Sequence, residues 1–167
     1  IVRTNYSQVH SRARRVAKAL QRRGIRLGDR VGTLAWNSAR HVEAWYGIMG
    51  LGAICHTINP RLFPEQITYI ANHAEDRMIF VDESLAEQLA PVQEHCKGVE
   101  RFVVMREGGS ERFGLRGETE YEDFLASAQP VTELPDLDEN TACALCYTSG
   151  TTGNPKGVLY SHRSTVL

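Results

Sequence analysis

The stretch VGTLAWNSARHVEAWYGIMGLGAICHTI, from Val31 to Ile58, decides the fold that we expect for this chain. It begins and ends with apolar, strand-like runs, and residues 38–51 between them have the spacing of a helix. Two strands joined through a helix form a right-handed crossover and lie parallel in one sheet. Gly47 beside Trp45 and Tyr46 indicates tight helix packing rather than a cofactor site built from the aromatic rings.

The same alternation of strand and helix continues on both sides of this stretch. Strand-like apolar runs begin near Val31, Ala53, Met78 and Phe102. Each interval between them leaves room for one helix and two short turns. Because repeated units of this kind need helices over both faces of the sheet, the pattern predicts an α/β fold with a mostly parallel, helix-covered sheet.

The expected helices carry recognisable start and stop signals. Apolar residues from Tyr6 to Leu20 recur in steps of three and four, with Asn5 as a cap and Gly24 as a stop, which predicts a first helix that covers the sheet. Residues 64–74 begin with a proline, which suits the first turn of a helix. Residues 84–96 begin with a serine and a glutamate at capping-box spacing.

Beyond the fourth apolar run the chain becomes polar. Residues 106–117 are rich in glycine and predict a surface excursion, and residues 121–128 can form a short helix. Residues 129–140 contain prolines and acidic side chains and are expected to be a linker. A solvated acidic loop is the main interpretation of that linker, with metal binding as the minor alternative.

The run YTSGTTGNPKGV, from Tyr147 to Val158, has the densest gathering of glycines and hydroxyl side chains in the chain. Glycine lets backbone amides approach an anion, and the hydroxyls and Lys156 add donors, so the run predicts a polyphosphate-binding loop. A flexible linker is the alternative, but apolar segments precede and follow the run. Lys156 lies between Pro155 and Gly157, which excludes the Walker A spacing.

Together with His162 and Arg163, this run resembles the phosphate loop of the adenylate-forming superfamily, which includes acyl-CoA synthetases, luciferases and the adenylation domains of peptide synthetases. The resemblance covers the whole chain as the N-terminal part of such an enzyme. The NPRL segment at residues 59–62 looks closest to fatty-acyl-CoA and methylmercaptopropionate-CoA ligases. The resemblance implies an acid–thiol ligase that converts a carboxylic acid, fatty or of short-to-medium chain, into an acyl-adenylate and then an acyl-CoA thioester, with ATP, Mg²⁺ and coenzyme A.

On this resemblance, the ATP phosphates would be held by Thr148, Ser149, Gly150, Thr151, Thr152, Gly153, Lys156 and Gly157. Thr148 would also bind Mg²⁺, on the resemblance alone. No catalytic set is complete, since the family's aromatic-Gly-x-Thr-Glu motif, ribose-binding aspartate and C-terminal lysine find no match. We therefore interpret the chain as a fragment and expect it to be inactive alone.

Two units are expected along the chain. Residues 1–128 would form an N-terminal α/β subdomain with most of the folded core. Residues 129–167 would be a loosely held linker and the start of a truncated phosphate-loop unit. The strand at residues 142–147 could find its neighbours beyond Leu167.

The overall composition, 42% hydrophobic and 23% charged residues, is that of a globular protein, and no apolar stretch is long enough for a membrane span. The four cysteines show no disulfide pattern and suit the cytoplasm. Cys143 and Cys146 form a CxxC. Positions three apart in a strand point to opposite faces, so we expect buried free thiols rather than a zinc or redox site.

The N-terminal region is strongly basic, although the net charge of the chain is only −1. Its cationic side chains are Arg3, Arg12, Arg14, Arg15, Lys18, Arg22, Arg23, Arg26 and Arg30. A nucleic-acid-binding module that uses this helix, or a non-catalytic module, is the alternative function. Because the arginines lie opposite the apolar stripe without interleaved aromatic residues, a solvated face is favoured and no nucleic-acid partner is expected. A homodimer is left open.

Overall fold

A computed structural model describes residues 3–106, 109, 111–129, 133–148 and 153–166. Seven strands form one sheet with the order β5-β4-β3-β1-β2-β6-β7. Their bounds are β1 Arg30–Leu34, β2 Ile54–Ile58, β3 Asp76–Asp82, β4 Arg101–Met105, β5 Thr119–Glu120, β6 Ala142–Thr148 and β7 Lys156–Ser161. Neighbouring strands run parallel except β6 and β7. The predicted α/β class with a mostly parallel sheet is confirmed.

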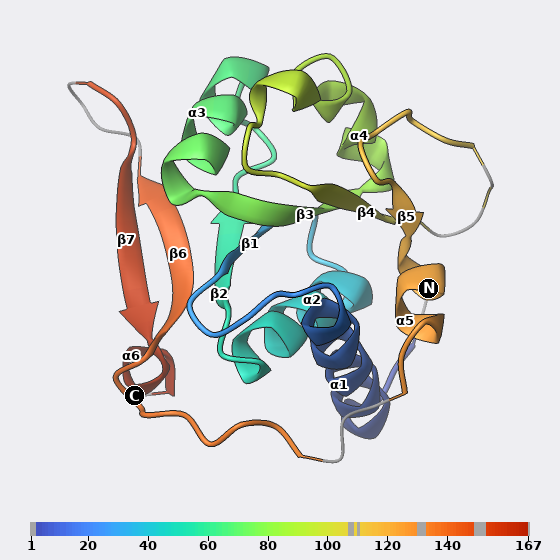
Figure 1. Cartoon of the computed structure of the whole chain (residues 1–167), viewed down its shortest axis with the longest axis vertical. Coiled ribbons are helices and arrows are strands. Elements are labelled where there is room, and N and C mark those ends of the chain that lie inside the picture. The colour runs from blue at the N-terminus through green and yellow to red at the C-terminus, as the bar shows by residue number, and fades with distance from the viewer. Residues whose placement is uncertain (1–2, 107–108, 110, 130–132, 149–152, 167) are drawn as a thin grey trace.

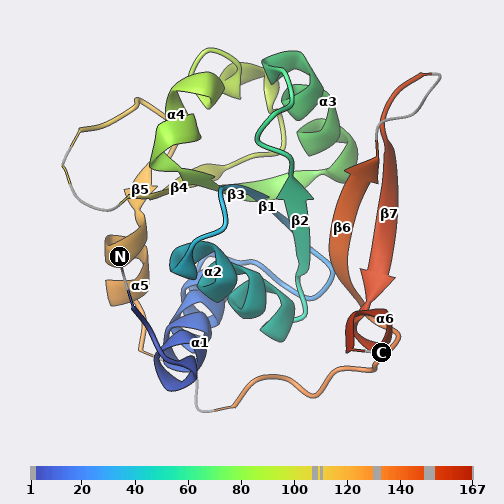
Figure 2. The same ribbon diagram turned by 180° about the vertical axis from the view of Figure 1, so that it is seen from behind.

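Helices cover both faces of this sheet (Figures 1 and 2). Their bounds are α1 Tyr6–Arg22, α2 Ala39–Gly50, α3 Pro64–Ala74, α4 Glu83–Leu89, α5 Tyr121–Ala126 and α6 His162–Val166, with a 3₁₀ turn at Gln93–His95. Helices α1, α2 and α5 lie on one face, and α3 and α4 lie on the other. Each face therefore buries its own apolar cluster.

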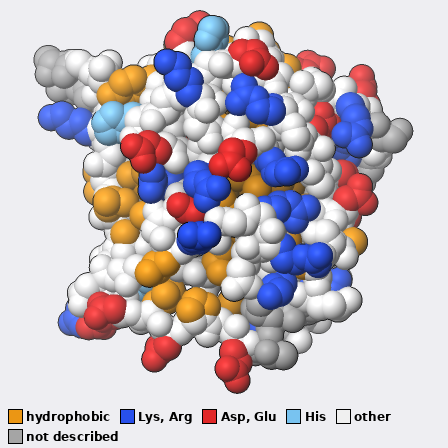
Figure 3. All heavy atoms as spheres, viewed as in Figure 1, with side chains coloured by type: hydrophobic (Ala, Val, Ile, Leu, Met, Phe, Trp, Pro, Cys, Tyr) orange, Lys and Arg blue, Asp and Glu red, His pale blue; other side chains and the backbone are white. Residues whose placement is uncertain are grey.

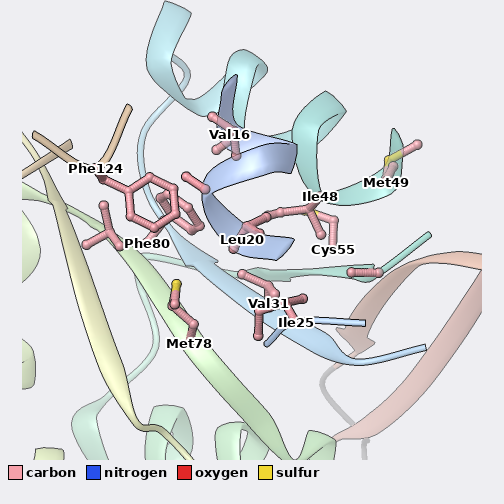
Figure 4. Close-up of a cluster of buried hydrophobic side chains, with 14 of the residues drawn as sticks. Val16, Leu20, Ile25, Val31, Ile48, Met49, Cys55, Met78, Phe80 and Phe124 are labelled. Atoms are coloured by element: carbon pink, nitrogen blue, oxygen red, sulfur yellow. The ribbon is translucent and has the colours of Figure 1, made fainter. Parts of the chain in front are cut away.

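The larger cluster joins α1, α2 and α5 to the sheet (Figure 4). Val16 and Leu20 of α1, Ile48 of α2 and Phe80 of β3 are fully buried in it. Helices α1 and α2 cross at Gly47, where an added Cβ would lie 2.6 Å from the Cβ of Val16. Gly47 therefore permits a close helix crossing, as its place in the sequence predicted.

The helix boundaries follow local signals in two cases and depart from them in a third. Asn5 caps α1 through a capping box, and α3 has the predicted bounds. The predicted helix over residues 84–96 is shorter: α4 ends at Leu89, because Pro91 has no backbone N–H to continue the helical hydrogen bonds and its ring clashes with the carbonyl four residues earlier. Its N-cap is Asp82, whose carboxylate accepts from the backbone N–H of Ser84.

Residues 142–161 complete the sheet at its other end. Strand β6 pairs in parallel with β2 and antiparallel with β7, so both of its neighbours belong to this chain. The expectation that they lie beyond Leu167 is therefore wrong. Cys143 is fully buried in the cluster under α1 and α2. Of the helices that the structure describes, none is long and apolar enough to cross a membrane.

Candidate functional site

The predicted phosphate-binding run forms the end of the β6–β7 hairpin. Tyr147 pairs with Gly157 and Thr148 pairs with Lys156 across the two strands. The Thr148 hydroxyl donates to the Lys156 carbonyl at 3.5 Å. Four of the predicted phosphate contacts, Ser149, Gly150, Thr151 and Thr152, lie outside the described residues. The structure thus brings Thr148 and Lys156 together, both exposed, at the base of the loop.

The hairpin end lies where α/β folds usually hold ligands. Because β6 is parallel to β2, its carboxyl end reaches the same edge of the sheet as the carboxyl ends of β1, β2 and β3 (Figure 2). In open parallel sheets, ligands bind outside these carboxyl ends. Gly153 has φ +102°, a conformation that favours glycine. The exposed Thr148 hydroxyl and Lys156 ammonium suit an anionic ligand with several oxygens.

Gly157 is glycine for a packing reason that the sequence did not reveal. A Cβ at this position would lie 3.1 Å from Leu145 Cδ1 and 3.2 Å from Tyr147 Cζ. The ring of Tyr147 therefore occupies the space that a side chain at residue 157 would need. The backbone of Gly157 can still face a phosphate, but the lack of a side chain is required by the packing of the hairpin stem.

Tyr147 connects the hairpin to the layer of α3. Its hydroxyl lies 2.6 Å from Nδ1 of His73, and its ring centroid lies 5.1 Å from that of His56. These two residues are 74 and 91 positions away in the chain, so periodicity and short motifs could not have identified them. Burial raises the pKa of the Tyr147 hydroxyl, and the nearby Asp76 carboxylate raises it further.

A buried polar pair lies behind Tyr147. His56 Nδ1 is 2.7 Å from Asp76 Oδ2, and both side chains are fully buried. The contact passes over Gly32 of the intervening strand β1, where a Cβ would lie 3.1 Å from Asp76 Oδ2. Burial raises the pKa of Asp76, while the hydrogen bond with His56 opposes part of that rise. A histidine inside a mostly apolar strand was the one available signal for this pair.

A cleft of about 420 Å³ opens on the opposite face of β6, between α2 and α6. Trp45 and Tyr160 supply apolar walls, and Thr57, His41 and Cys146 supply polar groups. Burial lowers the pKa of His41 despite its contact with the backbone carbonyl of Trp36. The cleft is mostly apolar and adjoins the hairpin stem.

The two cysteines of the CxxC do not point to opposite faces, and that prediction is wrong. Cys146 Sγ lies 3.0 Å from Thr57 Oγ1, on the side of the sheet that Cys55 also faces. Cys143 is buried in the same apolar cluster as Cys55 and Ala144. The reason is a register shift between Ala142 and Ala144, which breaks the alternation of the strand at Cys143. Within the described ranges, no group of three or more potential ligands is placed to hold a metal ion.

Arginines of the basic N-terminal helix contact neighbouring segments of the protein. Arg12 forms ion pairs of 2.8 Å with Glu43 of α2 and with Glu122 of α5. Arg22 donates to the Ser127 carbonyl at 2.6 Å. Figure 3 shows acidic side chains among the basic ones on this side of the molecule. These contacts give Arg12 and Arg22 a role in joining α1 to neighbouring segments.

Comparison with known proteins gives a consistent result. The family model described as "AMP-binding enzyme" matches residues 1–167. The chain is 50% identical to 3-methylmercaptopropionyl-CoA ligase of Ruegeria pomeroyi, over 98% of this chain and 31% of that protein. It is 48% identical to medium-chain-fatty-acid–CoA ligase of Ectopseudomonas oleovorans, over 100% of this chain and 31% of that protein.

Solved structures agree. The anthranilate CoA ligase AuaEII, crystallised in complex with anthranoyl-AMP, superposes with a TM-score of 0.85 at 32% identity, over 94% of this chain and 29% of that one. The chain thus spans about a third of the length of the relatives it matches.

Proposed function

Because the chain belongs to the AMP-binding enzyme family, we propose that the full-length protein is an acid–thiol ligase that activates a carboxylic acid with ATP. A carboxylate oxygen attacks the α-phosphorus, the bond to the bridging oxygen breaks, and pyrophosphate leaves with an acyl-adenylate remaining. The thiolate of coenzyme A then displaces AMP and forms the thioester. The match of the family model over the whole chain is the observation that carries this proposal.

The substrate that we propose is a fatty acid or a short-to-medium-chain acid. Support comes from the two ligases at 48% and 50% identity, whose names specify medium-chain fatty acids and 3-methylmercaptopropionate. Both acids join a carboxylate to a short apolar chain. We propose coenzyme A as the acceptor thiol on the same ground.

The β6–β7 hairpin is the proposed grip on the ATP phosphates. Lys156 and the Thr148 hydroxyl would hold the β- and γ-phosphates with the backbone amides of the glycines, and Ser149, Thr151 and Thr152 would add hydroxyls. The leaving pyrophosphate gathers negative charge as the bond breaks, so donors fixed in place there stabilise the transition state more than the substrate. Mg²⁺, with Thr148 as its proposed protein ligand, would supply further charge neutralisation at the phosphates.

We further propose that residues 1–128 form the N-terminal α/β subdomain and that residues 129–167 are a linker and the start of the phosphate-loop unit. The chain by itself holds only the phosphate grip, so adenylation is expected to need the rest of the enzyme. The four free cysteines favour a cytoplasmic protein.

The experiment is pyrophosphate exchange into ATP by the purified full-length protein, with single carboxylic acids as the added substrate. A panel should contain linear acids from acetate to dodecanoate together with 3-methylmercaptopropionate. We expect Mg²⁺-dependent exchange that requires one of these acids, followed by thioester formation when coenzyme A is added. Exchange that does not depend on the added acid would refute the proposed activity. The absence of exchange with every acid of the panel would refute it as well.

A further inference from the structure

Resting on the proposed function, we propose that Tyr147 and His73 are a positioning pair that ties the stem of the phosphate-binding hairpin to helix α3. Tyr147 immediately precedes Thr148, and it pairs across the hairpin with Gly157, the neighbour of Lys156. Neither Tyr147 nor His73 belongs to the predicted set of phosphate contacts. Their effect on ATP binding would pass through the position of the two strands.

The side chain of Tyr147 is held from two sides. Its hydroxyl lies 2.6 Å from His73 Nδ1, and the two rings meet edge to face with centroids 5.7 Å apart. His73 in turn stacks on Tyr69, one helical turn earlier in α3, at 5.6 Å. On the other side, the ring of Tyr147 lies against His56, which the buried Asp76 fixes at 2.7 Å. Both partners of Tyr147 are therefore themselves oriented.

The contact also reaches the second strand of the hairpin. An added Cβ on Gly157 would lie 3.2 Å from Tyr147 Cζ and 3.4 Å from its hydroxyl oxygen. The tyrosine ring thus lies directly against the backbone of β7, next to Lys156. Fixing the ring fixes the separation and tilt of the two strands from which Thr148 and Lys156 project.

Within the part of the chain that the structure describes, β7 pairs with one strand only, β6. Strand β7 is the last strand of the described sheet, and its residues are exposed from Lys156 to Tyr160. If only a fraction of the molecules has the strands in the binding arrangement, the apparent dissociation constant of ATP rises as the inverse of that fraction. One hydrogen bond of ordinary strength can change such a fraction by about 3- to 10-fold. ATP at saturation would restore the arrangement, so the maximal rate would change little.

The test compares variants of the full-length enzyme in acid-dependent pyrophosphate exchange, with ATP varied. Tyr147→Phe removes only the hydroxyl, and His73→Leu removes its partner together with the ring that stacks on Tyr69. Each is expected to raise KM for ATP about 3- to 10-fold with kcat within about 2-fold of wild type. The double variant should be no worse than either single one, because both remove the same contact. His73→Gln, whose amide oxygen can accept from the tyrosine, should restore KM to near the wild-type value.

The matched control is Tyr69→Phe, which removes a hydroxyl from the neighbouring ring and should leave KM for ATP unchanged. A fall in kcat and in melting temperature at an unchanged KM would show a merely structural contact and overturn the inference. Equal KM increases in Tyr69→Phe and Tyr147→Phe would overturn it as well. If Tyr147→Phe does not fold, the comparison of KM for ATP between His73→Leu and His73→Gln decides the question alone. Wild-type enzyme without acid-dependent exchange would instead refute the proposed function itself, and this inference with it.

Discussion

Replacing Gly47 by alanine tests the crossing of α1 and α2. The new Cβ would lie 2.6 Å from Val16 Cβ and 2.7 Å from the Ala13 carbonyl oxygen. Neither atom can turn away by a side-chain rotation, so α1 has to move. Overpacking of this kind costs up to about 3 kcal/mol. Alanine in place of glycine inside a helix returns about 1 kcal/mol.

The balance of these two effects is a loss of about 2 kcal/mol in the stability of the α1–α2 unit. Amide hydrogens of α1 and α2 that exchange through opening of this unit should therefore exchange about 30-fold faster in Gly47→Ala than in wild type. Hydrogen exchange followed by mass spectrometry on the full-length protein measures this directly. Peptides from α4, on the opposite face of the sheet, provide an internal reference.

Gly50→Ala is the matched control in the same helix. Its Cβ would meet the Leu134 side chain at 3.1 Å, and Leu134 is a flexible, half-exposed residue that can shift. We expect exchange in α1 and α2 at or slightly below the wild-type rate for this variant. Unchanged or slower exchange in Gly47→Ala would refute the argument, because the helix crossing would then not depend on the missing side chain.

The remaining predictions concern the loop, the thiols, the end of the chain and one histidine. Lys156→Ala in the full-length enzyme should slow acid-dependent pyrophosphate exchange by about 100-fold, and an unchanged rate would remove Lys156 from the mechanism. Elemental analysis should find no stoichiometric zinc, because Cys143 is buried among apolar side chains; one zinc per chain that is lost in Cys146→Ser would contradict this. In the isolated chain no acyl-adenylate should form, and acid-dependent exchange of pyrophosphate would refute this. Amide hydrogens of residues 142–147 should be protected from exchange, because β6 pairs with both β2 and β7, and rapid exchange there would contradict that pairing. His41 has a pKa below its usual 6.5 in the folded protein. The unfolded state therefore binds more protons than the folded state once the pH falls below about 6.5. Its contribution to stability should be full above that pH and decrease below it, and His41→Gln should lessen the loss of melting temperature between pH 7.5 and 5.5; an identical pH dependence in both proteins would contradict this.

Much of the fold could be predicted because its signals are local. The four apolar runs correspond to β1, β2, β3 and β4, and the helix predicted at residues 64–74 is α3. Capping chemistry and proline act on the residues next to them, so Asn5 marked the start of α1. The helix predicted at residues 84–96 was wrong only beyond Leu89, where the effect of Pro91 was not taken into account. Tyr6 continues the apolar stripe of α1 but is 95% exposed. A stripe shows which side of a helix is apolar, but it does not show how much of the helix length is covered by the rest of the protein.

The phosphate-binding run was also visible from the sequence, because its glycines, hydroxyls and lysine are consecutive. What holds that run was decided by tertiary structure. The sequence by itself determined the α/β alternation, most helix boundaries and the membership of Thr148 and Lys156 in one loop. The tertiary structure decided that β6 lies between β2 and β7, that a register shift at Cys143 places this residue in the apolar cluster that also holds Cys55, and that Tyr147 reaches His73. These contacts join residues far apart in the chain, and their partners are chosen by packing across strands rather than by any periodicity along one strand.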